Sequence, residues 1–164
     1  MILIKVFGCL NAKRVRYLVV GGVATVLYGN PRMTKDLDIW VDPDENNLQK
    51  VVQAFRQLKF IPRIPVKMGE MVSAGNRRQW RRQKGMLAFT MINPRNPFAN
   101  IDLLFEGPVS FSTAFKRKKN FLSGRTRIPV ISRLDLIRMK REAGRFQDLE
   151  DVKILRAARL KGST

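Results

Sequence analysis

Residues 31–42 read Pro31-Arg32-Met33-Thr34-Lys35-Asp36-Leu37-Asp38-Ile39-Trp40-Val41-Asp42, and this stretch decides the fold that we expect. Side chains alternate across a strand, so a strand over 36–42 would carry Asp36 and Asp38 on one face and aliphatic residues on the other. The strand rise would separate the two Asp Cα atoms by about 6.5–7 Å. Two carboxylates that close are costly unless a cation lies between them, so the stretch predicts a site for divalent metal ions.

A hydrophobic run and a pair of glycines precede this stretch. The run Tyr17-Leu18-Val19-Val20 predicts a buried strand over 16–20, and Gly21-Gly22 then opens a predicted helix over 23–28. Backbone amides at such a turn can face a triphosphate. A double glycine is by itself weak evidence, and the chain has neither a Walker-type lysine motif nor the G-x-G-x-x-G pattern. Gly21 and Gly22 are therefore candidate nucleotide-binding residues only in combination with the acids.

Asp102 is the candidate third acid. It stands in the apolar run Asn100-Ile101-Asp102-Leu103-Leu104, within a predicted strand over 99–105. A lone Asp among aliphatic residues is disfavoured unless it is paired or binds a metal. Pairing with an Arg at the strand end is the alternative. Taken together, Asp36, Asp38 and Asp102 are the predicted catalytic and metal-binding residues, and Asp42 and Asp44 are predicted to serve a turn and a helix N-cap.

The rest of the chain interleaves helices and strands, which predicts an α/β (α+β) fold with a mixed sheet flanked by helices and with C-terminal helices. We expect one domain over 1–164. The region 61–85 contains several Pro and Gly residues and is expected to be largely irregular. Helices are expected at 2–12, 44–59, 110–118, 132–143 and 146–160, and further strands at 86–92, 120–123 and 126–131. In the last helix Leu149, Val152 and Leu155 are expected to face inward.

Charge and composition restrict the function. The chain has 32 Lys and Arg against 13 Asp and Glu, a net charge of +19, and no His. The absence of His excludes His-based catalytic triads and His metal ligands. The single Cys9 excludes an internal disulfide and fits a reducing compartment. No apolar run is long enough for a membrane span or a signal-peptide core, so a cytoplasmic location is expected.

Two acid-free segments flank Asp102 and predict contact with a polyanion, RNA before DNA. Six Lys or Arg lie between Glu70 and Asp102, and seven lie between Glu106 and Asp135. Trp80, surrounded by Arg, is predicted to stack on an unpaired base. A solvated basic face is the alternative for either cluster. The candidate nucleic-acid-binding residues are Arg77, Arg78, Trp80, Arg81, Arg82, Lys116, Arg117, Lys118 and Lys119.

The chain resembles the nucleotidyltransferase superfamily related to DNA polymerase β, whose hallmark is a glycine pair, Asp-x-Asp on a strand and a third acid on a neighbouring strand. Within it, the chain is similar to small bacterial toxin-type nucleotidyltransferases of abortive-infection systems. The matching segments are 17–24, 29–38 and 101–104, with 135–140 and 144–151 near the C-terminus. Residues 61–98 match poorly.

The resemblance implies roles for these residues. Asp36, Asp38 and Asp102 would hold Mg²⁺ or Mn²⁺, Gly21 and Gly22 would cradle the triphosphate of an NTP, and Asp102 would help activate the attacking hydroxyl. Arg32 and Thr34 would contact phosphate or brace the strand. Lys140 is a candidate phosphate ligand, with a solvated helix lysine as the alternative. The remaining expectation is an ion-pair network that joins the last two helices through Arg145, Asp148 and Asp151.

Three functions follow from these features. The first is the transfer of a nucleotide from an NTP to a hydroxyl, expected at an RNA (tRNA) 3′ end and possible in a toxin–antitoxin pair with a partner protein. The second is nucleotidylation of a protein hydroxyl. The third is a non-catalytic nucleic-acid-binding module, against which the three intact aspartates argue. A cationic aminoglycoside is disfavoured as acceptor because a net charge of +19 would repel it.

Overall fold

The computed structural model describes residues 2–34 and 36–161, apart from the side chains of 97–99 and 158–161. Within this part of the chain, seven strands form one mixed sheet in the order β3-β4-β5-β2-β1-β7-β6. Strand β2 runs parallel to β5 and β1 runs parallel to β7, whereas the other neighbours are antiparallel. The strands are β1 (Tyr17–Val19), β2 (Leu37–Val41), β3 (Ile61–Pro62), β4 (Phe89–Asn93), β5 (Asn96–Leu104), β6 (Lys119–Ser123) and β7 (Thr126–Val130).

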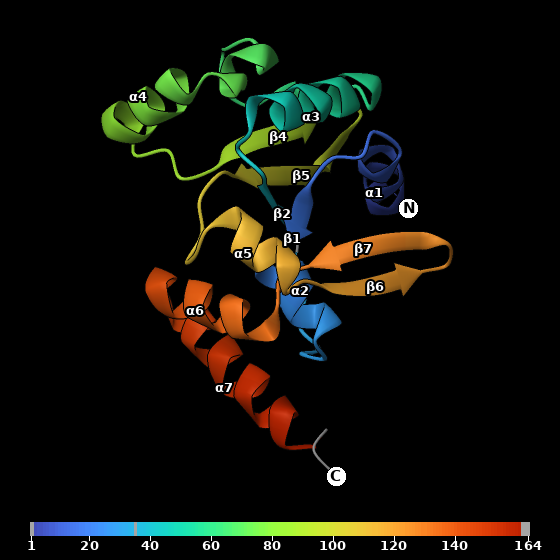
Figure 1. Cartoon of the computed structure of the whole chain (residues 1–164), viewed down its shortest axis with the longest axis vertical. Coiled ribbons are helices and arrows are strands. Elements are labelled where there is room, and N and C mark those ends of the chain that lie inside the picture. The colour runs from blue at the N-terminus through green and yellow to red at the C-terminus, as the bar shows by residue number, and fades with distance from the viewer. Residues whose placement is uncertain (1, 35, 162–164) are drawn as a thin grey trace.

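Helices cover the sheet, as the sequence predicts for an α/β fold (Figure 1). In the view of Figure 1, α3 and α4 lie at the top with β4 and β5 close to them, and α5, α6 and α7 lie below. The described part of the chain has no helix with the length and apolar character that a membrane crossing requires. The helices are α1 (Ile2–Ala12), α2 (Gly21–Leu27), α3 (Glu45–Gln57), the 3₁₀ helix η1 (Met68–Val72), α4 (Ala74–Lys84), α5 (Phe111–Lys116), α6 (Arg133–Ala143) and α7 (Phe146–Lys161).

The two faces of strand β2 differ: one face packs into the core, and the other carries Asp38 of the candidate site. Its aliphatic residues Leu37, Ile39 and Val41 are at most 1 % exposed, as their alternation predicts. Asp38 and Trp40 alternate with them, and the Trp40 ring packs edge-on against Phe111 of α5 at 5.4 Å. The acidic face of the sheet is therefore the face that α5 covers in part, and the central strand is fixed by burial on its other side.

The segment 61–85 is more regular than the sequence predicted. It contains η1 and α4, an 11-residue helix with Ser73 as N-cap and Gly85 as a left-handed C-cap. Trp80 is the one residue of α4 classed as buried, and its ring stacks on Phe89 of β4 with centroids 5.5 Å apart. The prediction that Trp80 stacks on a nucleic-acid base is therefore wrong for this conformation, because its ring anchors α4 to the sheet.

Most predicted boundaries of helices and strands are correct to within a few residues, but one boundary and one predicted side-chain position differ. Strand β4 begins at Phe89, not at 86, and leaves Leu87 75 % exposed. Leu149 is 45 % exposed, so its predicted inward position is wrong, whereas Val152 and Leu155 of the same helix are buried. The predicted cap of α3 is confirmed, because the carboxylate of Asp44 accepts from Asn47 N–H. At the start of α6 the Ser132 hydroxyl accepts from Asp135 N–H in the same way.

Candidate active site

Two of the three predicted acids lie side by side on parallel strands. Asp38 of β2 and Asp102 of β5 are register partners, and the hydroxyl of Thr90 on β4 donates to Asp102 Oδ1 at 2.6 Å. Asp36 is exposed and immediately precedes β2. The parallel pairing that the sequence could not specify thus brings Asp102 to the strand next to Asp38.

The ionised form of Asp38 is disfavoured in this arrangement. Burial, and then the negative charge of Asp102, raise the pKa of Asp38 to about 6, with a smaller contribution from Asp36. The backbone N–H of Gly22, which donates to this carboxylate, and the charge of Arg145 act in the opposite direction. A buried carboxylate beside further carboxylates is the environment that a divalent cation would relieve.

Metal ligation needs more than this pair. Among the residues that the structure describes, no three acidic or Cys side chains are gathered closely enough to hold a metal ion. The chemistry of the donors nevertheless fits Mg²⁺ or Mn²⁺, which prefer carboxylate oxygens and share their coordination with phosphate and water. Asp38 and Asp102 supply a preformed pair, to which Asp36 and an NTP would add ligands.

The Gly21-Gly22 turn packs directly against Asp38. Gly21 has a φ of +60°, and a Cβ built on it would lie 1.9 Å from Asp38 Oδ2. A Cβ on Gly22 would lie 2.3 Å from Thr34 Oγ1. The glycines are thus required for the close approach of the turn to Asp38 and Thr34. Since α2 has only seven residues and Gly22 N–H is engaged by Asp38, the predicted triphosphate cradle stays a prediction.

Gly21→Ala should lower the free energy of unfolding by about 2 kcal/mol or more, because left-handed backbone is strained for Ala and the methyl group overlaps Asp38. Gly8→Ala is the matched control, since Gly8 lies within α1 and a Cβ there meets nothing within 4 Å. It should raise stability by about 0.5–1 kcal/mol. Urea unfolding measures both. Equal stability of the two variants would contradict the close approach.

Arg32 reaches the glycine turn from the loop before β2. Its Nη2 would lie 3.1 Å from a Cβ on Gly22, and the same atom pairs with Asp151 of α7 at 3.0 Å. Its Nε is buried and has no hydrogen-bond partner among the described residues. An unpaired buried donor is costly. The atom beside Gly22 is Nη2, which Asp151 shares, so the phosphate contact of Arg32 stays a prediction.

The last two helices meet in a buried ion-pair network. Lys140 of α6 is 4 % exposed, and its Nζ donates to Asp151 Oδ2 at 2.7 Å and to Asp148 Oδ1 at 3.2 Å. Asp151 also accepts from Asn30 Nδ2 at 2.9 Å. The predicted network between α6 and α7 is present. Lys140 is neither solvated nor free, so this structure gives it a structural role in place of the predicted phosphate contact.

Arg145 is a further candidate site residue, and the sequence did not reveal its position near Asp38. Its Nε donates to Asp148 Oδ2 at 2.6 Å, its side chain is 79 % exposed, and its charge acts on the pKa of Asp38. The sequence placed Arg145 only in the network that joins the last two helices. The structure shows that Asp148, itself held by Lys140, orients an exposed guanidinium near the acids.

The network predicts a loss of stability in acid. Burial alone would raise the pKa of Asp148, but hydrogen bonds from Arg145 and Lys140 outweigh it and lower that pKa. Ionised Asp148 therefore stabilises the folded state fully above about pH 4, and this contribution is lost as the pH falls through the lowered value. In urea unfolding from pH 7 to 3, the stability difference between wild type and Asp148→Asn should shrink below about pH 4. A constant difference would contradict the pairing.

A cleft opens between α4, the end of β5 and α6. It has a volume of about 640 Å³, and Leu104, two residues after Asp102 on the same face of β5, contributes to it. Arg77, Arg78 and Arg81 of α4 line one side. Met139, Glu142 and Ala143 of α6 line the other. The predicted acids do not line this cleft, and Leu104 is its link to the strand that carries Asp102.

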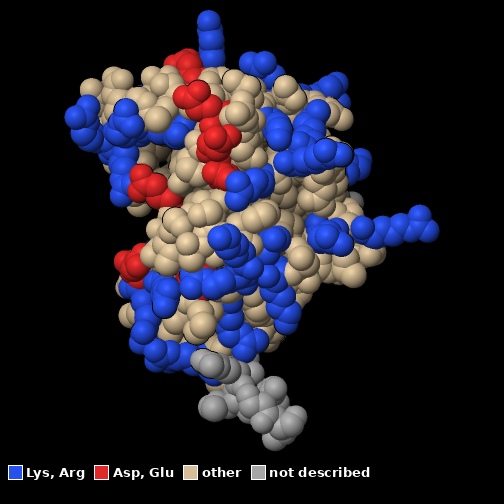
Figure 2. All heavy atoms as spheres, in the orientation of Figure 1, with Lys and Arg blue, Asp and Glu red and all other residues tan. Residues whose placement is uncertain are grey.

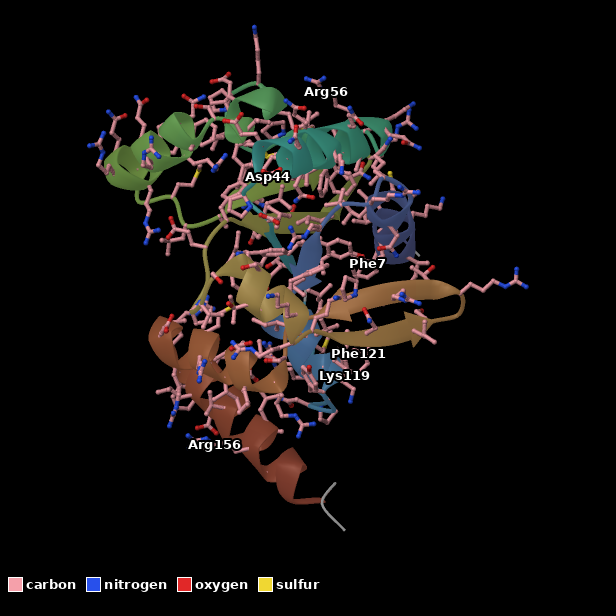
Figure 3. All side chains as sticks on the ribbon, viewed as in Figure 1. Phe7, Asp44, Arg56, Lys119, Phe121 and Arg156 are labelled. Atoms are coloured by element: carbon pink, nitrogen blue, oxygen red, sulfur yellow. The ribbon has the colours of Figure 1, made fainter. Side chains whose placement is uncertain are left out.

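The predicted nucleic-acid-binding residues divide into engaged and available cations. Arg77 donates to the carbonyls of Met71 and Val72, and Lys118 donates to the carbonyl of Phe115. The ammonium group of Lys119 lies 5.4 Å from the ring centroid of Phe121, and Figure 3 labels both residues near β6. Two others form ion pairs, Arg81 with Glu106 and Arg117 with Asp135. Three are exposed and take part in neither an ion pair nor a cation–ring contact with a described residue, namely Arg78, Arg82 and Lys116.

Comparisons with solved structures agree with the fold. The lincosamide antibiotic adenylyltransferase LnuA, solved with lincomycin bound, aligns with a TM-score of 0.62 at 16 % identity over 96 % of each chain. A Thermotoga maritima protein assigned as a nucleotidyltransferase gives 0.55 at 18 % identity over 94 % of this chain and 88 % of that one. An antigenic nucleotidyltransferase-like protein from Paracoccidioides brasiliensis gives 0.53 at 16 % over 93 % and 73 %. No protein-family profile and no curated sequence matches the chain. The chain thus has the nucleotidyltransferase fold.

Proposed function

We propose that this protein is a nucleotidyltransferase that moves a nucleotide from an NTP to a hydroxyl group of an acceptor. The observation that carries the proposal is the register pairing of Asp38 with Asp102, with the Gly21-Gly22 turn in contact with Asp38. The shared fold of the three solved proteins supports it. The spacing of the acids in the sequence independently predicts the same chemistry.

Each group has a task in this proposal. Asp36, Asp38 and Asp102 would hold Mg²⁺ or Mn²⁺, which supplies charge neutralisation for the phosphates and lowers the pKa of the attacking hydroxyl. Asp102, which accepts a hydrogen bond from the Thr90 hydroxyl, would help to activate the attacking hydroxyl of the acceptor. Arg32, whose Nη2 lies beside Gly22, would contact a phosphate, and Arg145 offers an exposed guanidinium near Asp38.

The acceptor that we propose is RNA, at a 3′ end such as that of tRNA, because the net charge of +19 attracts polyanions. A small hydroxyl compound is the second candidate. The cleft of about 640 Å³ falls within the range of small-molecule sites and has apolar lining from residues such as Phe105 and Met139, and LnuA acts on an antibiotic. Protein hydroxyls remain the third possibility that the assay must distinguish.

The proposal is tested by incubating the protein with Mg²⁺ and each labelled NTP in turn, with total RNA, a panel of hydroxyl antibiotics or a cell protein extract. Label in RNA supports the first acceptor, and label in a small molecule or in protein supports the others. Asp36→Ala should abolish every transfer, as should removal of the metal with a chelator. Equal labelling by wild type and Asp36→Ala would overturn the assignment of the acids.

A toxin role with a paired antitoxin and a cytoplasmic location also stay proposals, and they rest on the sequence resemblance and composition. Expression of the wild type should then arrest growth, and expression of Asp36→Ala should not. Arrest by both proteins would argue against toxicity through nucleotide transfer.

A further inference from the structure

We propose that α4 is a nucleic-acid-binding helix whose outer face guides a single RNA strand into the cleft that Leu104 and Phe105 line. This inference extends the proposed function. It rests on that function only for the transfer of a nucleotide to the 3′ end of the bound RNA. Binding along α4 itself needs neither NTP nor metal.

Helix α4 is rich in basic residues and is attached to the rest of the protein mainly through one buried side chain, that of Trp80. Among its 11 residues are five cations and no acid, and Trp80 is the one buried residue. The stacking of Trp80 on Phe89 attaches the helix to β4, and Arg77 secures its start through the carbonyls of η1. Most helical stability in proteins comes from the packing of a buried face, so the exposed cations of α4 contribute little to the stability of the helix. They are therefore available for a ligand.

The available cations lie on one side of α4. Arg78 and Arg82 are separated by one helical turn, so their side chains are neighbours. Both line a surface hollow of about 520 Å³ that runs along the helix together with Gly75, Asn76 and Gln79. Figure 2 shows basic side chains over the α4 region at the upper left of the molecule. Two neighbouring guanidinium groups, flanked by amide side chains, suit consecutive phosphates of a nucleic-acid strand.

The hollow and the cleft share a wall. Arg78 and Arg81 line both, so a strand that lies along α4 enters the cleft without leaving the protein surface. Glu106, an acid of the cleft wall just after β5, is paired with Arg81. Within the cleft, Leu104 and Phe105 offer apolar surface to a base, and Leu104 is two residues from Asp102. A strand end held at Leu104 would lie two residues along β5 from Asp102.

The test is binding of a labelled 20-nucleotide single-stranded RNA by fluorescence anisotropy, without NTP or metal, from 50 to 300 mM salt. Arg78→Ala/Arg82→Ala should reduce the salt slope of log K by about 1.4, which corresponds to about 20-fold weaker binding near 0.1 M salt. Lys50→Ala/Arg56→Ala removes the same charge from two exposed residues of α3 and should change binding little. Figure 3 shows Arg56 at the upper edge of the molecule, far from α6.

Each other outcome overturns the proposal. Equal loss of affinity in the α3 and α4 variants would show a response to net charge alone. Displacement of the RNA by poly-glutamate at equal charge concentration would show a general polyanion surface. Nucleotide binding is measured separately on the wild type, so an absence of RNA binding with intact nucleotide binding overturns the role of α4 without affecting the proposed transferase.

Discussion

Replacing Asp38 with Asn should abolish nucleotide transfer and at the same time make the metal-free protein more stable. Both effects have one cause, the burial of Asp38 beside Asp102 that raises its pKa to about 6. A folded state that raises the pKa of a carboxyl is destabilised by the ionised form at neutral pH. The neutral amide removes that cost and keeps an oxygen to accept from Gly22 N–H.

The expected gain is about 2 kcal/mol in the free energy of unfolding, or about 4–8 °C in melting temperature, in the presence of a chelator. Transfer should fall about 10³-fold or more, as for the loss of an essential catalytic group. The natural control is Asp42→Asn, at the end of the same stretch. Asp42 pairs with Arg16 at 2.7 Å, so this change should leave transfer intact and give no gain in stability.

Two results would contradict the assignment. A stability gain without loss of transfer would mean that Asp38 is a strained but idle carboxylate. A loss of transfer together with a loss of stability would mean that Asp38 supports the fold and that its charge is not repelled. Opposite signs for activity and stability are the mark of a residue retained for chemistry at the expense of stability.

The acids show how far the sequence could predict the site. The alternation of Asp36-Leu37-Asp38 with buried neighbours indicated the strand and its two faces, and the apolar context of Asp102 indicated a second strand. The pairing of β2 with β5 joins residues more than sixty positions apart, and only the structure places Asp38 beside Asp102. Local patterns carry no information on which strands pair, because that depends on packing of the whole sheet.

Helix α4 shows why the middle of the chain was harder to predict. Its sequence lacks the apolar residues at three- and four-residue spacing that indicate a helix, because it buries Trp80 alone. Trp80 among arginines matched a base-stacking pattern equally well, and only the position of Phe89 on β4 decides that the ring is internal. Burial of Lys140 was hidden for a related reason, since Asn30 and Arg32, which complete its network through Asp151, lie more than a hundred residues away.

Lys140→Met should cause the largest loss of stability of the single changes considered, about 3–5 kcal/mol, or about 10 °C in melting temperature. Met keeps much of the volume and removes the charge. Asp148 and Asp151, both at most 4 % exposed, would then face an apolar side chain and lose their buried cation. Each acid would keep one arginine, Arg145 for Asp148 and Arg32 for Asp151, but the loss of the buried ammonium would leave part of its desolvation cost uncompensated. Thermal and urea unfolding measure the effect.

Lys153→Met is the control that removes an equal charge from an exposed ion pair, so it distinguishes the effect of burial from the effect of charge. Lys153 also pairs with an acid of α7, Glu150 at 2.5 Å, but its side chain is 72 % exposed, so the change should cost less than about 1 kcal/mol. Similar losses of stability in both variants would show that the ion pairs of Lys140 contribute no more than an ordinary surface ion pair. Lys140→Met should lose more stability than Lys153→Met. It should also weaken NTP binding, because Asp151 pairs with Arg32 and Asp148 orients Arg145. The buried lysine would then support the nucleotide site through the two acids that it holds.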